Sequence, residues 1–103
     1  LFENLVINEL LKNIKNSGSQ SQLYYWRDNK GVEVDALIDA GKKLIPIEIK
    51  SAQTFQDNQL KSLLQWNSYS GVKGGYMFYD GQLEFSADKI AINSWRQAGK
   101  LKL

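Results

Sequence analysis

The sequence contains no cysteine and no histidine among its 103 residues. The absence of cysteine excludes disulfide frameworks, thiolate zinc sites, iron–sulfur clusters and cysteine nucleophiles. The absence of histidine excludes serine–histidine triads and nearly all catalytic zinc sites. Any chemistry therefore depends on carboxylates, lysine, hydroxyl groups and the backbone. Any bound metal is expected to be a hard ion that prefers oxygen ligands.

The charge balance and the hydropathy indicate which partners and which cellular location to expect. The formal net charge is +2, from 13 basic and 11 acidic residues, which by itself does not indicate a nucleic-acid partner. No apolar run approaches the ~20 residues that span a bilayer, and no signal-peptide pattern is present. We therefore expect a cytoplasmic protein with no membrane partner. The length predicts one domain over residues 1–103, and the start at Leu1 suggests the C-terminal fragment of a longer chain.

The first half of the chain predicts a helix followed by three strands. Apolar residues spaced by three and four positions favour an amphipathic helix over residues 1–16. A short aromatic segment, 23–27, is typical of a strand. The segments 32–39 and 44–50 alternate between apolar and polar residues, and short turns separate all three strands. This half is therefore expected to form an antiparallel meander.

Two details of these strands are predicted from the alternation. Val34 and Ala36 should lie on one face of the second strand, with Asp35 on the other. Pro46 cannot donate a ladder hydrogen bond, so we expect an edge register or a bulge at its position.

The second half predicts a helix over residues 57–69, a strand over 74–79 and a hairpin that leads to 82–85. Asp88 is expected to cap a last helix over the apolar residues that follow it. The aromatic segment from Tyr24 to Trp26 is expected to pack in the core, with base stacking as the alternative.

Three charged residues within the predicted strands could carry chemistry. Asp35 lies inside an otherwise apolar strand, and Glu48 and Lys50 share one face of the next strand because residues i and i+2 project together. A hairpin would bring Asp35 close to both. Two carboxylates can hold Mg²⁺, whose bound water becomes more acidic, and an ammonium can stabilise negative charge on a phosphate. The alternative is a solvated strand face with a surface ion pair.

These residues carry a resemblance to a known family. Val34-Asp35, followed by Glu48-Ile-Lys50, resembles the metal-binding signature of the PD-(D/E)XK nuclease superfamily. The predicted order of elements resembles its αβββαβ core, an α/β fold of the restriction-endonuclease type with a mixed central sheet flanked by helices. More narrowly, LFENLV (1–6), WRDNKGVEVD (26–35) and LIPIEIKS (44–51) resemble the uncharacterised C-terminal domain appended to many prokaryotic AAA-type ATPases.

The resemblance assigns roles to individual residues. It implies that Asp35, Glu48 and Lys50 are catalytic, with Val34 in place of the proline that gives the superfamily its name. It implies a bound Mg²⁺ or Mn²⁺ and no organic cofactor. Glu3 on the first helix is the implied third metal ligand, beside Asp35 and Glu48.

Two further acids are left with open roles. Glu9 lies on the same predicted helix as Glu3 and is the fallback for the third ligand. Glu33 belongs to the narrower family's string and is either an additional ligand or, by preference, a charge on the solvated face of its strand.

The function implied by the resemblance is a metal-dependent nuclease that hydrolyses DNA phosphodiester bonds. DNA and an upstream ATPase domain are the implied partners, with a homodimer as one option. The alternatives are a catalytically inactive module that binds DNA or protein for the ATPase, and a structural dimerisation domain with no site.

Overall fold

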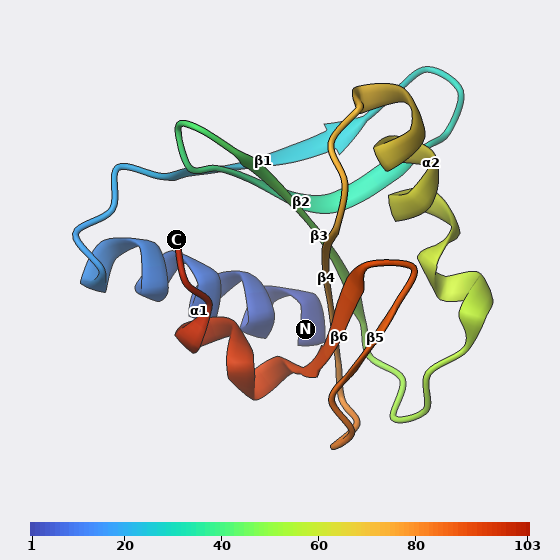
Figure 1. The fold of residues 1–103 in the computed structure, drawn as a ribbon. Coiled ribbons are helices and arrows are strands. Elements are labelled where there is room, and N and C mark those ends of the chain that lie inside the picture. Colours follow the sequence, from blue (N-terminus) through green and yellow to red (C-terminus); the bar gives the residue numbers. More distant parts are fainter.

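A computed structural model describes residues 1–103, which form one six-stranded sheet flanked by helices (Figure 1). The strand order is β1-β2-β3-β4-β6-β5. The β1–β2–β3 and β5–β6 pairs are antiparallel, whereas β3–β4 and β4–β6 are parallel. The strand bounds are β1 Gln22–Arg27, β2 Glu33–Asp39, β3 Leu44–Lys50, β4 Gly75–Tyr79, β5 Phe85–Ala87 and β6 Ile90–Ser94. The α/β class with a mixed sheet flanked by helices is thus confirmed.

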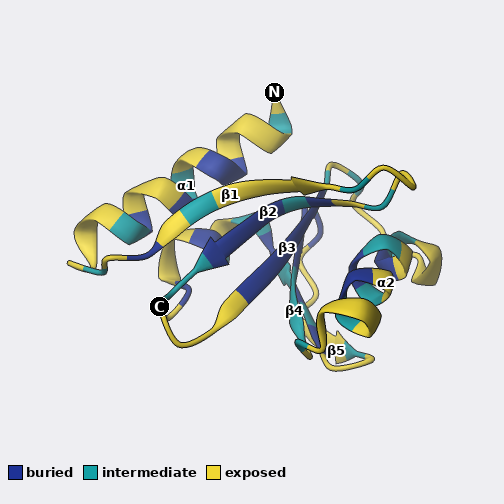
Figure 2. Ribbon diagram, turned by 90° about the horizontal axis from the view of Figure 1, so that it is seen from above, coloured by how far each residue is buried: buried dark blue, intermediate teal, exposed yellow.

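Helices cover both faces of this sheet (Figure 2). Helix α1, Phe2–Asn16, packs on one face, and α2, Lys61–Ser70, packs on the other after a 3₁₀ turn η1, Asp57–Leu60. A second 3₁₀ segment, η2 (Trp95–Lys100), lies against α1. The elements from α1 to β4 therefore follow the predicted order αβββαβ. None of the helices combines the length and the apolar character that crossing a membrane requires.

The core has one main cluster on each face of the sheet. On the α1 face, Ile45, Ile47 and Ile49 of β3 pack with the apolar stripe of α1, as the alternation in β3 predicts. On the α2 face, Leu63 packs with Met77 of β4 and with the isoleucines of β6. Since β3 and β4 are covered on both faces, their positions are fixed by packing.

The sequence predicts an edge register or a bulge at Pro46, and β3 has no bulge there. Pro46 pairs with Leu37 of β2, and the register between β2 and β3 is unbroken on either side of it. The parallel ladder between β3 and β4 begins only at Ile47 and Tyr76, so Pro46 lies just before that ladder. The preceding part of β4 approaches closely: a side chain on Gly75, whose φ is +137°, would place Cβ 2.7 Å from the Pro46 carbonyl oxygen. Only glycine fits there.

The C-terminal segment corrects two predictions. Ile90–Ser94 is strand β6 and not a helix, and Asp88 is a turn residue of the β5–β6 hairpin with φ of 51°. The hairpin expected through residues 80–85 is also wrong, because β5 pairs with β6 and β4 runs parallel to β6. Ile90 and Ile92 are both buried, two positions apart, which is the strand period. The only helical structure beyond them is η2.

Candidate functional site

The candidate site lies where β2 and β3 separate. Their ladder ends at the pair Ala36 and Ile47, although β2 continues back to Glu33 and β3 continues on to Lys50. The next facing positions along the two strands are Asp35 and Glu48. We call this opening between the unpaired ends of β2 and β3 the fork.

A β-bulge in β2 lies at the same place. Tyr24 pairs with Leu37 and Trp26 with Val34, so the single residue Tyr25 faces two residues of β2, Asp35 and Ala36. A bulge of this kind bends its strand and changes the direction of a side chain.

The bulge also corrects a prediction, because it reverses the alternation on its N-terminal side. Val34 packs with Leu37 and Trp66 on the α2 face, whereas Ala36 packs on the α1 face. The alternation in the sequence predicts a shared face for Val34 and Ala36. The extra residue in β2 shifts the phase of the strand by one, so that they do not share one.

Asp35 is held in the fork by the backbone of β3. Its Oδ2 accepts a hydrogen bond of 2.8 Å from the N–H of Ile49. This N–H belongs to the part of β3 that has lost its β2 partner, and a buried N–H without an acceptor is costly. The carboxylate therefore takes the place of the missing strand, and its position is fixed by the backbone.

Glu48 is the most buried charged residue of the chain, with 4% of its surface exposed. Burial raises its pKa from 4.5 to about 9, and the hydrogen bond and charge repulsion from Asp35 act in the same direction. The nearby Lys50 ammonium offsets only part of this increase. In the absence of a cation, burial and the neighbouring Asp35 carboxyl therefore both favour the protonated form of Glu48.

Lys50 lies at the mouth of the fork. Its Nζ is 3.7 Å from Glu48 Oε1, and 41% of its side chain is exposed, against 5% for Glu48. The ammonium thus touches the buried carboxyl on one side and solvent on the other, so a phosphate arriving from solvent could reach it. The structure brings Asp35, Glu48 and Lys50 together.

Glu3 and Asp35 line the same hollow at the β1 edge of the sheet. This hollow has a volume of about 330 Å³, and we call it the edge hollow. Its lining residues are Glu3, Tyr25, Trp26, Arg27, Glu33, Val34 and Asp35. Glu3 lies on the first turn of α1, so it reaches the hollow from the helix, while the other residues come from β1 and β2.

The two remaining acids lie in different surroundings. Glu33 forms a 2.8 Å ion pair with Arg27, and its side chain is half exposed. Glu9 lies 4.0 Å from Lys12 and lines a separate hollow on the outer surface of α1, away from Asp35. Of the two acids considered on the first helix, Glu3 is the one near Asp35.

The fork offers two carboxylates to a cation, not three. Nowhere in the chain do three or more acidic side chains approach closely enough to hold one metal ion, so Glu3 does not join Asp35 and Glu48 in a single cluster. Mg²⁺ is commonly held by one or two carboxylates and keeps several waters, so this donor set fits it. The repulsion between Asp35 and Glu48 is also what a divalent cation would relieve.

The aromatic residues of β1 are exposed, which contradicts the prediction that they pack in the core. The exposed fractions are 47% for Tyr24, 70% for Tyr25 and 37% for Trp26. Strand β1 is an edge strand, and α1 covers only its first part, through Leu23. The sequence shows that β1 is aromatic, but not that it lies at the edge.

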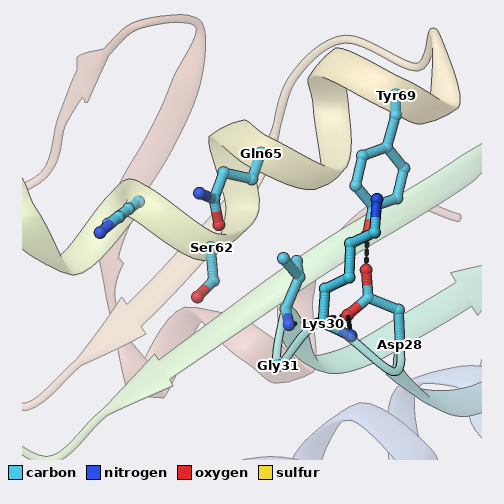
Figure 3. A pocket seen from close by; sticks show the side chains of 8 residues that line it. Asp28, Lys30, Gly31, Ser62, Gln65 and Tyr69 are labelled. Atoms are coloured by element: carbon cyan, nitrogen blue, oxygen red, sulfur yellow. Dashed lines mark hydrogen bonds between the residues drawn. The ribbon is translucent and has the colours of Figure 1, made fainter.

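A larger hollow of about 540 Å³ lies between the β1–β2 turn and α2 (Figure 3). The Tyr69 hydroxyl donates to Asp28 there, which lowers the pKa of that carboxyl, with further lowering by the Val32 backbone N–H. The other Asp28 oxygen accepts from the N–H groups of Lys30 and Val32, both at 2.9 Å. Asp28 thus shapes the turn and ties it to α2, and no acidic partner lies beside it in this hollow.

Fold and site together define an α/β protein of the order αβββαβ, with two neighbouring carboxyls and a lysine in a fork of its sheet. The chain belongs to the family described as Domain of unknown function (DUF4143), whose profile matches residues 1–97. The match covers every helix and strand of the core and all the site residues. A comparison with curated proteins gave no match.

Proposed function

We propose that this chain is a metal-dependent nuclease domain of the PD-(D/E)XK type that hydrolyses DNA phosphodiester bonds. The observation that carries the proposal is the contact between Asp35 and the buried Glu48 in the fork, with Lys50 Nζ 3.7 Å from Glu48. A surface ion pair would not need a buried carboxyl whose pKa is raised. Such perturbed groups concentrate at functional sites.

In this proposal Asp35 and Glu48 hold Mg²⁺ or Mn²⁺, and Glu3 is the third acid on the far side of the edge hollow. A bound divalent ion lowers the pKa of its water and neutralises charge on the phosphate. Asp35 is already positioned by the Ile49 N–H. Glu48 releases its proton to solvent when it takes up the ion, because a ligating carboxyl must be ionised.

Lys50 acts on the substrate in this scheme. Its ammonium orients the attacking water and stabilises the negative charge that grows on the phosphate. The water oxygen forms the new bond to phosphorus and releases one proton to solvent, while the bond to one ester oxygen breaks and that oxygen takes up a proton from solvent. The partial exposure of Lys50 gives it access to both the fork and the substrate.

In this proposal the chain is one domain of a cytoplasmic ATPase. The family resemblance of the strings around Glu3, Asp35 and Glu48 favours an upstream AAA-type ATPase domain that delivers DNA to the site. The alternative is an inactive module that holds DNA or a protein partner for that ATPase.

The experiment is a cleavage assay on plasmid and branched DNA with Mg²⁺ or Mn²⁺. Lys50→Met removes the ammonium and keeps the apolar stem, and should reduce cleavage by about 10²-fold or more. DNA affinity should change little, because phosphate contacts are spread over the surface. Lys43→Met is the control, because Lys43 is exposed in the turn at the other end of the β2–β3 hairpin.

Three outcomes would contradict the proposal. Cleavage that survives Lys50→Met would refute the assigned role of Lys50. No cleavage by the wild-type protein with either metal would favour the inactive module. A parallel loss in the Lys43→Met variant would mean that net charge, not position, matters.

A further inference from the structure

The edge hollow contains an exposed aromatic ring beside a residue of the candidate site. Tyr25 is 70% exposed, and it faces the bulge at Asp35 and Ala36 across the β1–β2 ladder. Tyr25 and Asp35 both line the hollow. An exposed tyrosine ring next to a polar site is a surface that a planar ligand can cover, because its faces are apolar and its edge is polar.

The hollow has the size and the polar groups of a small binding site. Its volume of about 330 Å³ is at the lower end of the range of about 300–1,000 Å³ that small ligands occupy. Arg27 lies at its rim and is 74% exposed, so it can meet a phosphate, although Glu33 is its present partner. Glu3 and Asp35 complete the polar lining.

We propose that the edge hollow receives an unpaired nucleotide of single-stranded DNA, with its base stacked on Tyr25 and its phosphate directed toward Asp35. This inference rests on the proposed function, since it identifies the form of DNA that the same site takes. Every base has a flat face that stacks on an aromatic ring. In a duplex those faces are covered by neighbouring base pairs, so only an unpaired base can use Tyr25.

The charge of the hollow makes this binding depend on a cation. Glu3, Glu33 and Asp35 carry three carboxyl groups there, against the single guanidinium of Arg27. A DNA strand would be repelled unless a divalent ion lies between its phosphate and these acids. The strand should therefore bind more tightly with Mg²⁺ than with a chelator, whereas binding to a basic surface would weaken when Mg²⁺ is added.

The test measures binding of fluorescein-labelled oligothymidylate and of a mixed-sequence duplex of equal length by fluorescence anisotropy. All proteins carry Lys50→Met so that the DNA stays intact, and each is measured in Mg²⁺ and in a chelator. Tyr25→Ala should weaken oligothymidylate binding about tenfold, the scale of one lost stacking contact. Tyr25→Phe keeps the ring and should bind as the parent protein does.

Tyr24→Ala is the matched control. Tyr24 is the neighbouring exposed tyrosine of β1, and consecutive strand residues project to opposite faces. It does not line the edge hollow. Its substitution removes the same side chain from the same edge strand and should leave binding unchanged. Circular dichroism of each variant confirms that the fold is retained.

Several results would overturn the inference. These are tighter binding of the duplex than of the single strand, equal losses in Tyr25→Ala and Tyr24→Ala, or no gain from Mg²⁺. A change of oligomeric state in Tyr25→Ala without a change in DNA binding would instead make this edge a protein interface.

Cleavage by the Lys50-containing protein separates this inference from the proposed function. Cleavage of duplex in preference to single strands would leave the nuclease standing and refute the inference. Binding that depends on Tyr25, without any cleavage, would support the inference and refute the nuclease function.

Discussion

Replacing Glu48 by glutamine should stabilise the folded protein at neutral pH when no divalent cation is present. The Glu48 carboxyl is buried beside Asp35, and its pKa is raised from 4.5 to about 9. Between these two pH values the native protein holds a proton that the unfolded chain has released. Glutamine resembles the protonated carboxyl, since its amide can also donate to Asp35, and it has no charge to bury.

The direction of the pH dependence follows from this proton. Because the folded-state pKa of Glu48 is the higher one, folding takes up a proton, and stability is greatest below pH 4.5 and declines as the pH rises toward 9. The slope approaches about 1.4 kcal/mol per pH unit within that window. At pH 7 the accumulated loss is about 3 kcal/mol, a large part of the 5–15 kcal/mol that is typical of a small domain.

Urea unfolding followed by tryptophan fluorescence in a chelating buffer measures this effect. Data from about pH 5.5 to about pH 8.5 avoid the acid range in which Asp28, whose pKa is lowered, takes up its proton. The wild-type protein should lose stability across this range, and Glu48→Gln should lose much less. Glu33→Gln is the control, because that carboxyl is half exposed and paired with Arg27 at the surface.

Equal pH slopes in the wild-type protein and in Glu48→Gln would refute the reasoning. That result would mean that Glu48 is ionised in the native state, and that the fork is open enough to hydrate it. The same slope change in Glu33→Gln would assign the effect to the net charge of the chain.

Two further predictions concern the metal and the core. Mg²⁺ or Mn²⁺ should raise the melting temperature of the wild-type protein by a few degrees in differential scanning fluorimetry and leave that of Asp35→Asn unchanged. The asparagine amide oxygen can still accept from the Ile49 N–H, so the variant keeps this backbone contact. An equal shift in both proteins would indicate nonspecific binding of the ions. Asn13→Ala should lower stability to urea by about 1–3 kcal/mol, because the buried Asn13 amide donates to two carbonyls near the C-terminus, at 3.1 and 2.7 Å. Asn16→Ala, at an exposed position of the same helix, should change it little.

The order of elements could be predicted from the sequence because each signal was local. Alternation identified β2 and β3, and the three- and four-residue spacing identified α1 and most of α2. A sequence pattern is ambiguous where it fits two kinds of secondary structure. Ile90 and Ile92 are compatible with a helix that continues to Trp95 as well as with a strand, and only pairing with β4 and β5 decides between them.

The residues of the site could be predicted from the sequence, but the backbone arrangement that holds them could not. Spacing in one strand places Glu48 beside Lys50, and a hairpin places Asp35 nearby, as in the structure. The bulge opposite Tyr25 leaves no mark in a single sequence, because it depends on how β1 pairs with β2. The donor to Asp35 is a backbone N–H, which every residue but proline has, so no side chain could reveal it.

Lys50 is the clearest position at which to separate chemistry from folding, because Asp35 and Glu48 both also contribute to the stability of the sheet. Asp35 replaces a missing strand partner for the Ile49 N–H, so removing its acceptor would leave a buried donor unpaired. Glu48 is buried in the sheet, so any change there alters stability as well as charge. Lys50 extends to solvent and donates no hydrogen bond to a backbone group in the fork. Its loss should therefore leave the fold intact, and any loss of DNA cleavage can be attributed to the missing ammonium.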